Sequence, residues 1–138
     1  MKIALREAQI ALESGEIPVG AVVVSQNRII ARGHNQTELL KDVTAHAEMI
    51  AVTAAANGLH NKYLNDCTLY VTLEPCPMCA GALAWAQLGR LVYGASDDKR
   101  GFSQFSPNLL HPKTVVVSGI LERVSVEMLR AFFREKRT

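Results

Sequence analysis

Long apolar runs, a disulfide framework and low-complexity segments are all missing from this sequence of 138 residues. No stretch approaches the roughly 18 to 20 apolar residues that a membrane-spanning helix requires, so we expect no membrane partner. There are only three cysteines, and residues 1–16 interleave charged and apolar positions instead of forming a leader's apolar run. These features favour a cytoplasmic protein, in which disulfides rarely persist and closely spaced cysteines often bind metal.

The sequence also has no large excess of basic or acidic residues, because its formal net charge is only +2. That value is too small to identify a nucleic-acid partner, yet residues 123–138 hold five of the basic residues and only two acidic ones. The basic residues are Arg123, Arg130, Arg134, Lys136 and Arg137. They fit either a solvated helix end whose cations complement the helix dipole or a basic patch that binds phosphate.

The apolar content of 49% suits one domain with a hydrophobic core, which we expect to cover residues 1–138. Short elements of alternating type predict a layered α/β domain. The predicted helices are residues 1–16, 43–57, 78–88 and 124–137. The predicted strands are residues 17–24, 28–34, 67–73, 90–95 and 114–120. Thr44 is the expected N-cap of the second helix, and Gly58 is expected just after its end.

Two of the three cysteines lie in the segment "EPCPMCAG", where Cys76 and Cys79 are one helical turn apart. Pro77 suits the first position of a helix, and the dipole at a helix start favours thiolates, the form that binds metal. The spacing C-x-x-C alone also fits a redox dithiol or a structural zinc site, so further ligands are needed. Cys67 begins the preceding strand and is interpreted as a small packed hydrophobe.

The segment "TAHAEM" offers a third ligand, His46, with a carboxylate two residues later at Glu48. In mid-helix these two side chains would point about 200° apart, so they can share a site only in the first turn. One histidine and two cysteines leave a fourth position open, as in catalytic zinc sites. Zinc there lowers the pKa of a bound water to roughly 7, and Glu48 is suited to move the protons. The alternatives are a helix-capping His46 and a Glu48 that complements the helix dipole.

The combination His-x-Glu followed by Pro-Cys-x-x-Cys is the signature of zinc-dependent nucleobase deaminases. The sequence resembles the bacterial tRNA-specific adenosine deaminase family along nearly its whole length. The segments that carry this resemblance are "GEIPVGAVVV", "HNQTELLKDVTAHAEM", "TLYVTLEPCPMCAGALAWAQLGRLVYGA" and "FFREKR". Together with the order of elements, it implies a three-layer α/β/α fold with a five-stranded mixed sheet and one zinc ion per subunit.

The resemblance also assigns roles to residues around the predicted zinc site. It implies that Asn35 hydrogen-bonds the base, that Ala47 offers its backbone amide, and that Ile17, Pro18 and Val19 form an apolar wall. The alternative for Asn35 is a turn residue after the second strand, where Asn is common, but the "HN" context and the resemblance favour the pocket role. Core packing accounts equally well for Ile17 and Val19.

At the C-terminus, the resemblance places Phe132, Phe133 and Arg134 near the nucleic acid, although an apolar stripe and a helix-end cation explain them without RNA. The resemblance is weakest at residues 99–113, "KRGFSQFSPNLLHPK". There Phe102 and Phe105 could stack on unpaired bases or pack beneath the loop.

Three functions remain open on the sequence alone. The first is conversion of adenosine to inosine in a tRNA anticodon loop, and the second is deamination of a free base or nucleoside such as guanine, cytosine or cytidine. The third is a non-catalytic zinc-stabilised module, which would need neither an open coordination position nor Glu48.

A homodimer is also expected, because the helix "MCAGALAWAQL" is apolar on every side and must be covered on every side. Trp85 is a candidate anchor for the partner. The alternative is that the first and last helices of the same chain cover it.

Overall fold

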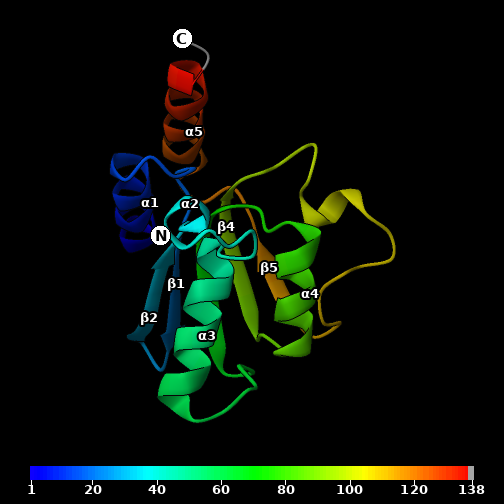
Figure 1. The fold of residues 1–138 in the computed structure, drawn as a ribbon. Helices are drawn as coiled ribbons and strands as arrows, with labels where there is room; N and C mark the ends of the chain where they lie inside the picture. The colour runs from blue at the N-terminus through cyan, green and yellow to red at the C-terminus, as the bar shows by residue number, and fades with distance from the viewer. Residues whose placement is uncertain (137–138) are drawn as a thin grey trace.

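The structure is a computed structural model that describes residues 1–136 of the chain. Its helices are α1 (Lys2–Glu13), α2 (Thr37–Leu40), α3 (Ala47–Leu59), α4 (Pro77–Trp85), α5 (Glu122–Lys136) and the short 3-10 helix η1 (Phe102–Gln104). Its strands are β1 (Gly20–Ser25), β2 (Arg28–His34), β3 (Cys67–Leu73), β4 (Arg90–Ala95) and β5 (Val115–Val117) (Figure 1). No helix within residues 1–136 has the length and apolar character needed to cross a membrane.

The five strands form one mixed sheet in the order β2-β1-β3-β4-β5. β1 is antiparallel to both β2 and β3, whereas β3, β4 and β5 run parallel to one another. Gln26 and Asn27 make the tight turn between β1 and β2, with φ angles of 51° and 62°. The parallel pair β3 and β4 requires a crossover, which α4 provides.

Two glycines in neighbouring strands show that helices cover both faces of the sheet. A Cβ atom at Gly20 would collide with the α1 backbone at Ala4, whereas one at Gly33 would lie 2.7 Å from the Ala47 carbonyl oxygen of α3. Ala21 is paired with Gly33 in the sheet, and successive residues of a strand point to opposite faces. α1 and α3 therefore lie on opposite sides.

The other two long helices complete the layers. α5 packs on β4 and contacts α1, while α4 contacts α3 (Figure 1). The hydrophobic core includes fully buried alanines of α3, Ala51 and Ala55, together with Leu69 and Leu83 from β3 and α4. The small alanines allow α3 to lie close to the sheet. The prediction of a three-layer α/β/α fold with a five-stranded mixed sheet is confirmed.

Several element boundaries differ from the sequence expectation. Thr44 does not cap the second long helix, because its hydroxyl donates to Asp42 Oδ1 at 2.7 Å and α3 begins only at Ala47. Gly58 lies inside α3, and His60 ends this helix with a left-handed φ of 52°. The expected strands at 17–24 and 114–120 are shorter, α4 ends at Trp85, and α2 and η1 were not expected. Arg137 of the basic C-terminal group lies outside the described residues.

Candidate metal centre and active site

The three predicted metal ligands come from the starts of two neighbouring helices. His46 lies in extended conformation immediately before α3, and Cys76 lies in the same conformation before α4. Pro77 occupies the first turn of α4, as its fixed φ favours, and Cys79 follows in that turn. Because α3 and α4 pack against each other, their starts bring these side chains together.

The spacing of the three donor atoms fits a zinc ion. His46 Nδ1 lies 3.6 Å from Cys76 Sγ and 3.4 Å from Cys79 Sγ. Tetrahedral zinc with ordinary Zn–N and Zn–S bonds would place these atoms about 3.6 Å apart. All three ligand atoms lie within 4.8 Å of one another, and no other such group occurs among residues 1–136. One nitrogen and two sulfur donors suit zinc and leave a fourth position for water or substrate.

The pKa values of the two thiols are shifted in opposite directions. A hydrogen bond from Cys79 lowers the pKa of the Cys76 thiol to about 4, against the effect of its burial, and His46 adds to this shift. The same hydrogen bond to Cys76, with burial, raises the pKa of Cys79. Cys76 in turn raises the pKa of His46. Cysteine binds metal as the thiolate, and the lowered pKa of Cys76 favours that form.

Glu48 lies in the first turn of α3, and its side chain is only 5% exposed. Burial raises the pKa of this carboxyl to about 7, and the positive charge of His46 opposes the shift. A group that titrates close to neutral pH can both accept and donate a proton there. Glu48 is thus suited to proton transfer in a way that an exposed glutamate would not be.

Glu48 faces a cavity of about 520 Å³, which is large enough for a nucleobase with part of its sugar. The cavity is lined by Ile17, Val19, Asn35, His46, Glu48, Leu73, Glu74, Cys76, Pro77, Met78, Asp97, Arg100 and Phe105. Two metal ligands, the acid–base candidate and the predicted base-binding Asn35 therefore share one cavity.

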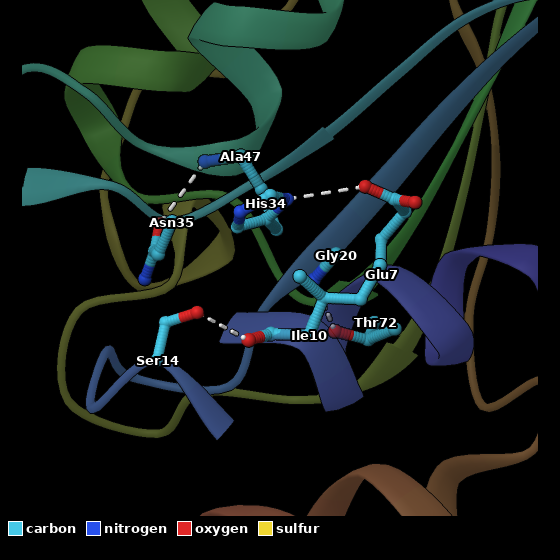
Figure 2. Close-up of polar contacts among 8 residues, drawn as sticks. All are labelled: Glu7, Ile10, Ser14, Gly20, His34, Asn35, Ala47 and Thr72. Carbon is cyan, nitrogen blue, oxygen red and sulfur yellow. Dashed lines mark hydrogen bonds and ion pairs between the residues drawn. The ribbon is translucent and has the colours of Figure 1, made fainter. Parts of the chain in front are cut away.

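Asn35 is held in one orientation by two hydrogen bonds. Its Oδ1 accepts from the backbone N–H of Ala47 at 3.0 Å (Figure 2). Its Nδ2 donates to the Ile17 carbonyl oxygen at 3.2 Å. The second Nδ2–H has no partner among the described residues, so it is available to a substrate. The Ala47 amide, expected to face the substrate, is engaged by Asn35 in this structure.

The predicted apolar wall is divided between cavity and core. Ile17 is 39% exposed, and Val19 is 5% exposed, and both line the cavity. Val19 also belongs to the hydrophobic core, so it both packs in the core and forms part of the cavity wall. Pro18 is fully buried and is not among the cavity-lining residues of the described chain.

The predicted RNA contacts in α5 lie at a second cavity of about 480 Å³. Phe133 and Arg134 line it together with Arg130 and the end of β4 at Ala95 and Ser96. Phe132 is instead 8% exposed and stacks edge-on against Phe133. Ser96 directly precedes Asp97, which lines the first cavity, so the two cavities flank one short segment.

The loop after β4 contributes residues that were not singled out from the sequence. Asp97 and Arg100 line the main cavity, as does Glu74 at the end of β3. The two loop phenylalanines differ in their surroundings: one packs beneath the loop and the other faces the cavity. Phe102 is 6% exposed and packs edge-on against Tyr93, whereas Phe105 is 46% exposed and lines the cavity.

The remaining cysteine and one histidine have structural roles. Cys67 is buried in the core, as its interpretation as a packed hydrophobe predicts. His34 Nδ1 lies 3.1 Å from Glu7 Oε1 of α1, on the face of the sheet opposite α3 (Figure 2).

Comparison with known proteins decides the family. The sequence matches the MafB19-like deaminase family over residues 1–137. It is 48% identical to a tRNA-specific adenosine deaminase of Agrobacterium fabrum, over 99% of this chain and 93% of the relative. The chain belongs to the tRNA-specific adenosine deaminase family.

Two solved structures extend this result. A structure from a study of A-to-I editing by tRNA:A34 deaminases superposes with a TM-score of 0.88 and 46% identity, covering 94% of this chain and 97% of that one. A guanine deaminase of Bacillus subtilis is 42% identical, with a TM-score of 0.66, over 69% of this chain and 61% of that one. The solved structures similar to this chain thus include a tRNA deaminase and a guanine deaminase.

Proposed function

We propose that this protein is a zinc-dependent hydrolytic deaminase that converts adenosine to inosine in a tRNA anticodon loop. The observation that carries the proposal is the buried Glu48 carboxyl in one cavity with His46 and Cys76 of the ligand group. The relatives named tRNA-specific adenosine deaminase support the choice of substrate. The net reaction consumes water and adenosine and yields inosine and ammonia.

His46, Cys76 and Cys79 would hold the zinc ion. When bound, zinc supplies a hydroxide at neutral pH by lowering the pKa of its water. Glu48 would take a proton from the attacking water and deliver it to the adenine ring nitrogen beside the carbon that bears the amino group. It would then carry the remaining proton of the added hydroxyl to the amine, which leaves as ammonia, so the same carboxyl acts as base and as acid.

Asn35 positions the base through its free Nδ2–H, and the Ala47 amide acts by fixing the orientation of Asn35. Ile17 and Val19 supply apolar surface beside the base, and Pro18 between them in the sequence is buried. A base bound against these residues is desolvated, which strengthens its hydrogen bond with Asn35.

The RNA around the target adenosine would extend from the main cavity towards α5. The segment at Ser96 and Asp97 separates the two cavities, and Arg130 and Arg134 line the second. Their positive charges suit phosphate groups, and Phe133, 44% exposed, offers a ring for stacking. This arrangement favours a basic patch over a helix end that merely solvates its charges. We also propose a cytoplasmic location, which a tRNA substrate fits.

The similarity to a guanine deaminase supports a second candidate function, the deamination of a free base or nucleoside. Ammonia release from a tRNA panel and from a panel of guanine, cytosine, cytidine and adenosine separates the two. The proposal predicts release from tRNA that carries an unpaired adenosine, together with inosine in the digested RNA. Turnover of a free base alone would contradict it.

We also propose a homodimer that covers α4. The first and last helices of the same chain, α1 and α5, lie on the other face of the sheet and so do not pack on α4. Trp85 is 86% exposed, and together with Tyr63 it lines two surface cavities of about 300 and 380 Å³. A second copy of this apolar surface would bury the indole, as interface anchors commonly are.

A further inference from the structure

The proposed mechanism leaves one buried carboxylate at the main cavity without a role. Glu74 follows β3, two residues before Cys76, and is only 3% exposed. Its Oε1 accepts a hydrogen bond from the backbone N–H of Asp97 at 3.0 Å. Its Oε2 accepts from the backbone N–H of Ser103 at 3.0 Å and from the Ser103 hydroxyl at 2.7 Å. One carboxylate therefore holds the loop at two points.

The loop between those two points is closed tightly around Glu74. A Cβ atom at Gly101 would collide with all three atoms of the Glu74 carboxylate. The N–H of Phe102 donates to the Pro75 carbonyl oxygen at 2.9 Å, and its ring packs against Tyr93. The residues between Leu73 and Cys76 thus form the support on which the loop rests.

The same loop provides part of the cavity wall. Asp97, Arg100 and Phe105 line the cavity in which Glu48 and Asn35 lie. Arg100 is exposed and Phe105 is 46% exposed, so neither is held in place by the core. Their positions depend on the backbone of the loop, which Glu74 fixes at Asp97 and Ser103.

We propose that Glu74 is a positioning residue that ties the cavity-lining loop, residues 97–105, to the segment that joins β3 to Cys76. By this tie it sets the affinity for the part of an RNA substrate that lies beyond the target adenosine. This inference rests on the proposed function for its substrate, but the tie itself does not. A carboxylate is required because it accepts on both oxygens, whereas a glutamine would turn an N–H donor towards another donor.

The test compares the zinc-loaded full chain with its Glu74→Gln variant. Glu7→Gln is the matched control, because Glu7 is a partly buried carboxylate on the opposite face of the sheet. Trypsin cleavage after Lys99 and Arg100 reports directly on the order of the loop. We expect Glu74→Gln to speed this cleavage about tenfold, as the loss of a charge-assisted hydrogen bond implies. Cleavage in the control should match that of the unchanged protein.

Steady-state kinetics on a stem–loop RNA with an unpaired adenosine give the second measurement. We expect KM to rise about tenfold in Glu74→Gln, with kcat within about twofold and zinc content unchanged. A merely structural role would instead lower the active fraction, and so kcat, at constant KM. Loss of zinc or of kcat with unchanged KM would overturn the inference.

Two further variants change loop residues that contact Glu74, instead of Glu74 itself. Gly101→Ala adds only the colliding methyl group, because Gly101 has a φ of −65° that alanine adopts freely. Ser103→Ala removes only the 2.7 Å hydroxyl contact, so it should give a smaller change in the same direction even if Glu74→Gln does not fold. Unchanged trypsin cleavage in both would overturn the tie. If the unchanged protein does not deaminate the RNA, the proposed function fails, and trypsin cleavage still decides the tie.

Discussion

At the scale of single residues, the site depends on a carboxyl group whose proton affinity is set by burial. Glu48 is nearly inaccessible to solvent, and this raises its pKa to about 7. The sequence predicted that His46 and Glu48 share a site at a helix start, and the structure places His46 immediately before α3 and Glu48 in its first turn. A glutamate later in the same helix would point elsewhere.

Replacing Glu48 with glutamine should preserve the cavity and remove proton transfer. We expect zinc content to remain at one per chain and kcat to fall by a factor on the order of 10² to 10⁴, the usual contribution of general acid–base catalysis. Zinc analysis beside single-turnover rates checks this. Glu48→Ala should behave in the same way. Near-normal turnover in either variant would remove Glu48 from the mechanism.

Replacing a ligand should have a different signature from replacing Glu48. His46→Ala leaves the two sulfur atoms without their nitrogen partner, so we expect loss of both zinc and activity. The matched control is His34→Ala, which removes a histidine on the other face of the sheet. Zinc content measured after dialysis distinguishes them, and full zinc retention in His46→Ala would contradict the assignment of this ligand.

At the scale of elements, the strands predicted at residues 28–34, 67–73 and 90–95 have the boundaries of β2, β3 and β4. The proline after Cys76 similarly predicted the start of α4. Thr44 was misleading because capping residues also form turns, and here Asp42 accepts its hydroxyl. The role of Glu74 could not be predicted, since its partners lie 23 and 29 residues further along the chain in a segment without periodicity.

The position of α3 depends on Gly33 in β2. A Cβ atom there would lie 2.7 Å from the Ala47 carbonyl oxygen and 3.0 Å from the Ala51 nitrogen, so α3 must move. We expect Gly33→Ala to lower the free energy of unfolding by about 1 to 3 kcal/mol and to lower kcat, because His46 and Glu48 move with the helix start. Urea unfolding and turnover measure both effects.

Gly58 provides the matched control for that experiment, because it lies within α3 and an added Cβ would meet nothing within 4 Å. Gly58→Ala should raise the free energy of unfolding by up to about 1 kcal/mol through helix propensity, with unchanged kcat. Equal effects of the two substitutions would show that α3 tolerates a shift at Gly33.

At the scale of the whole molecule, the layers leave one side of α4 exposed to solvent. α4 supplies Cys79 to the ligand group and Leu83 to the core, yet its end at Trp85 faces solvent in the single chain. An apolar helix with an exposed indole is the pattern of an interface. A dimer through α4 would also place the partner near the start of the same helix, where the substrate cavity lies.

A charge on this surface should therefore separate the two copies. We expect Trp85→Glu or Ala84→Asp to give a monomer at micromolar concentration, with zinc retained and turnover of RNA reduced. Val43→Glu is the control for adding a charge to an exposed apolar position, since Val43 is 85% exposed and Trp85 is 86% exposed. Sedimentation velocity of the three variants and of the unchanged protein measures the effect. A monomer in the unchanged protein would refute the dimer, and an equal loss of dimer in Val43→Glu would place the interface elsewhere.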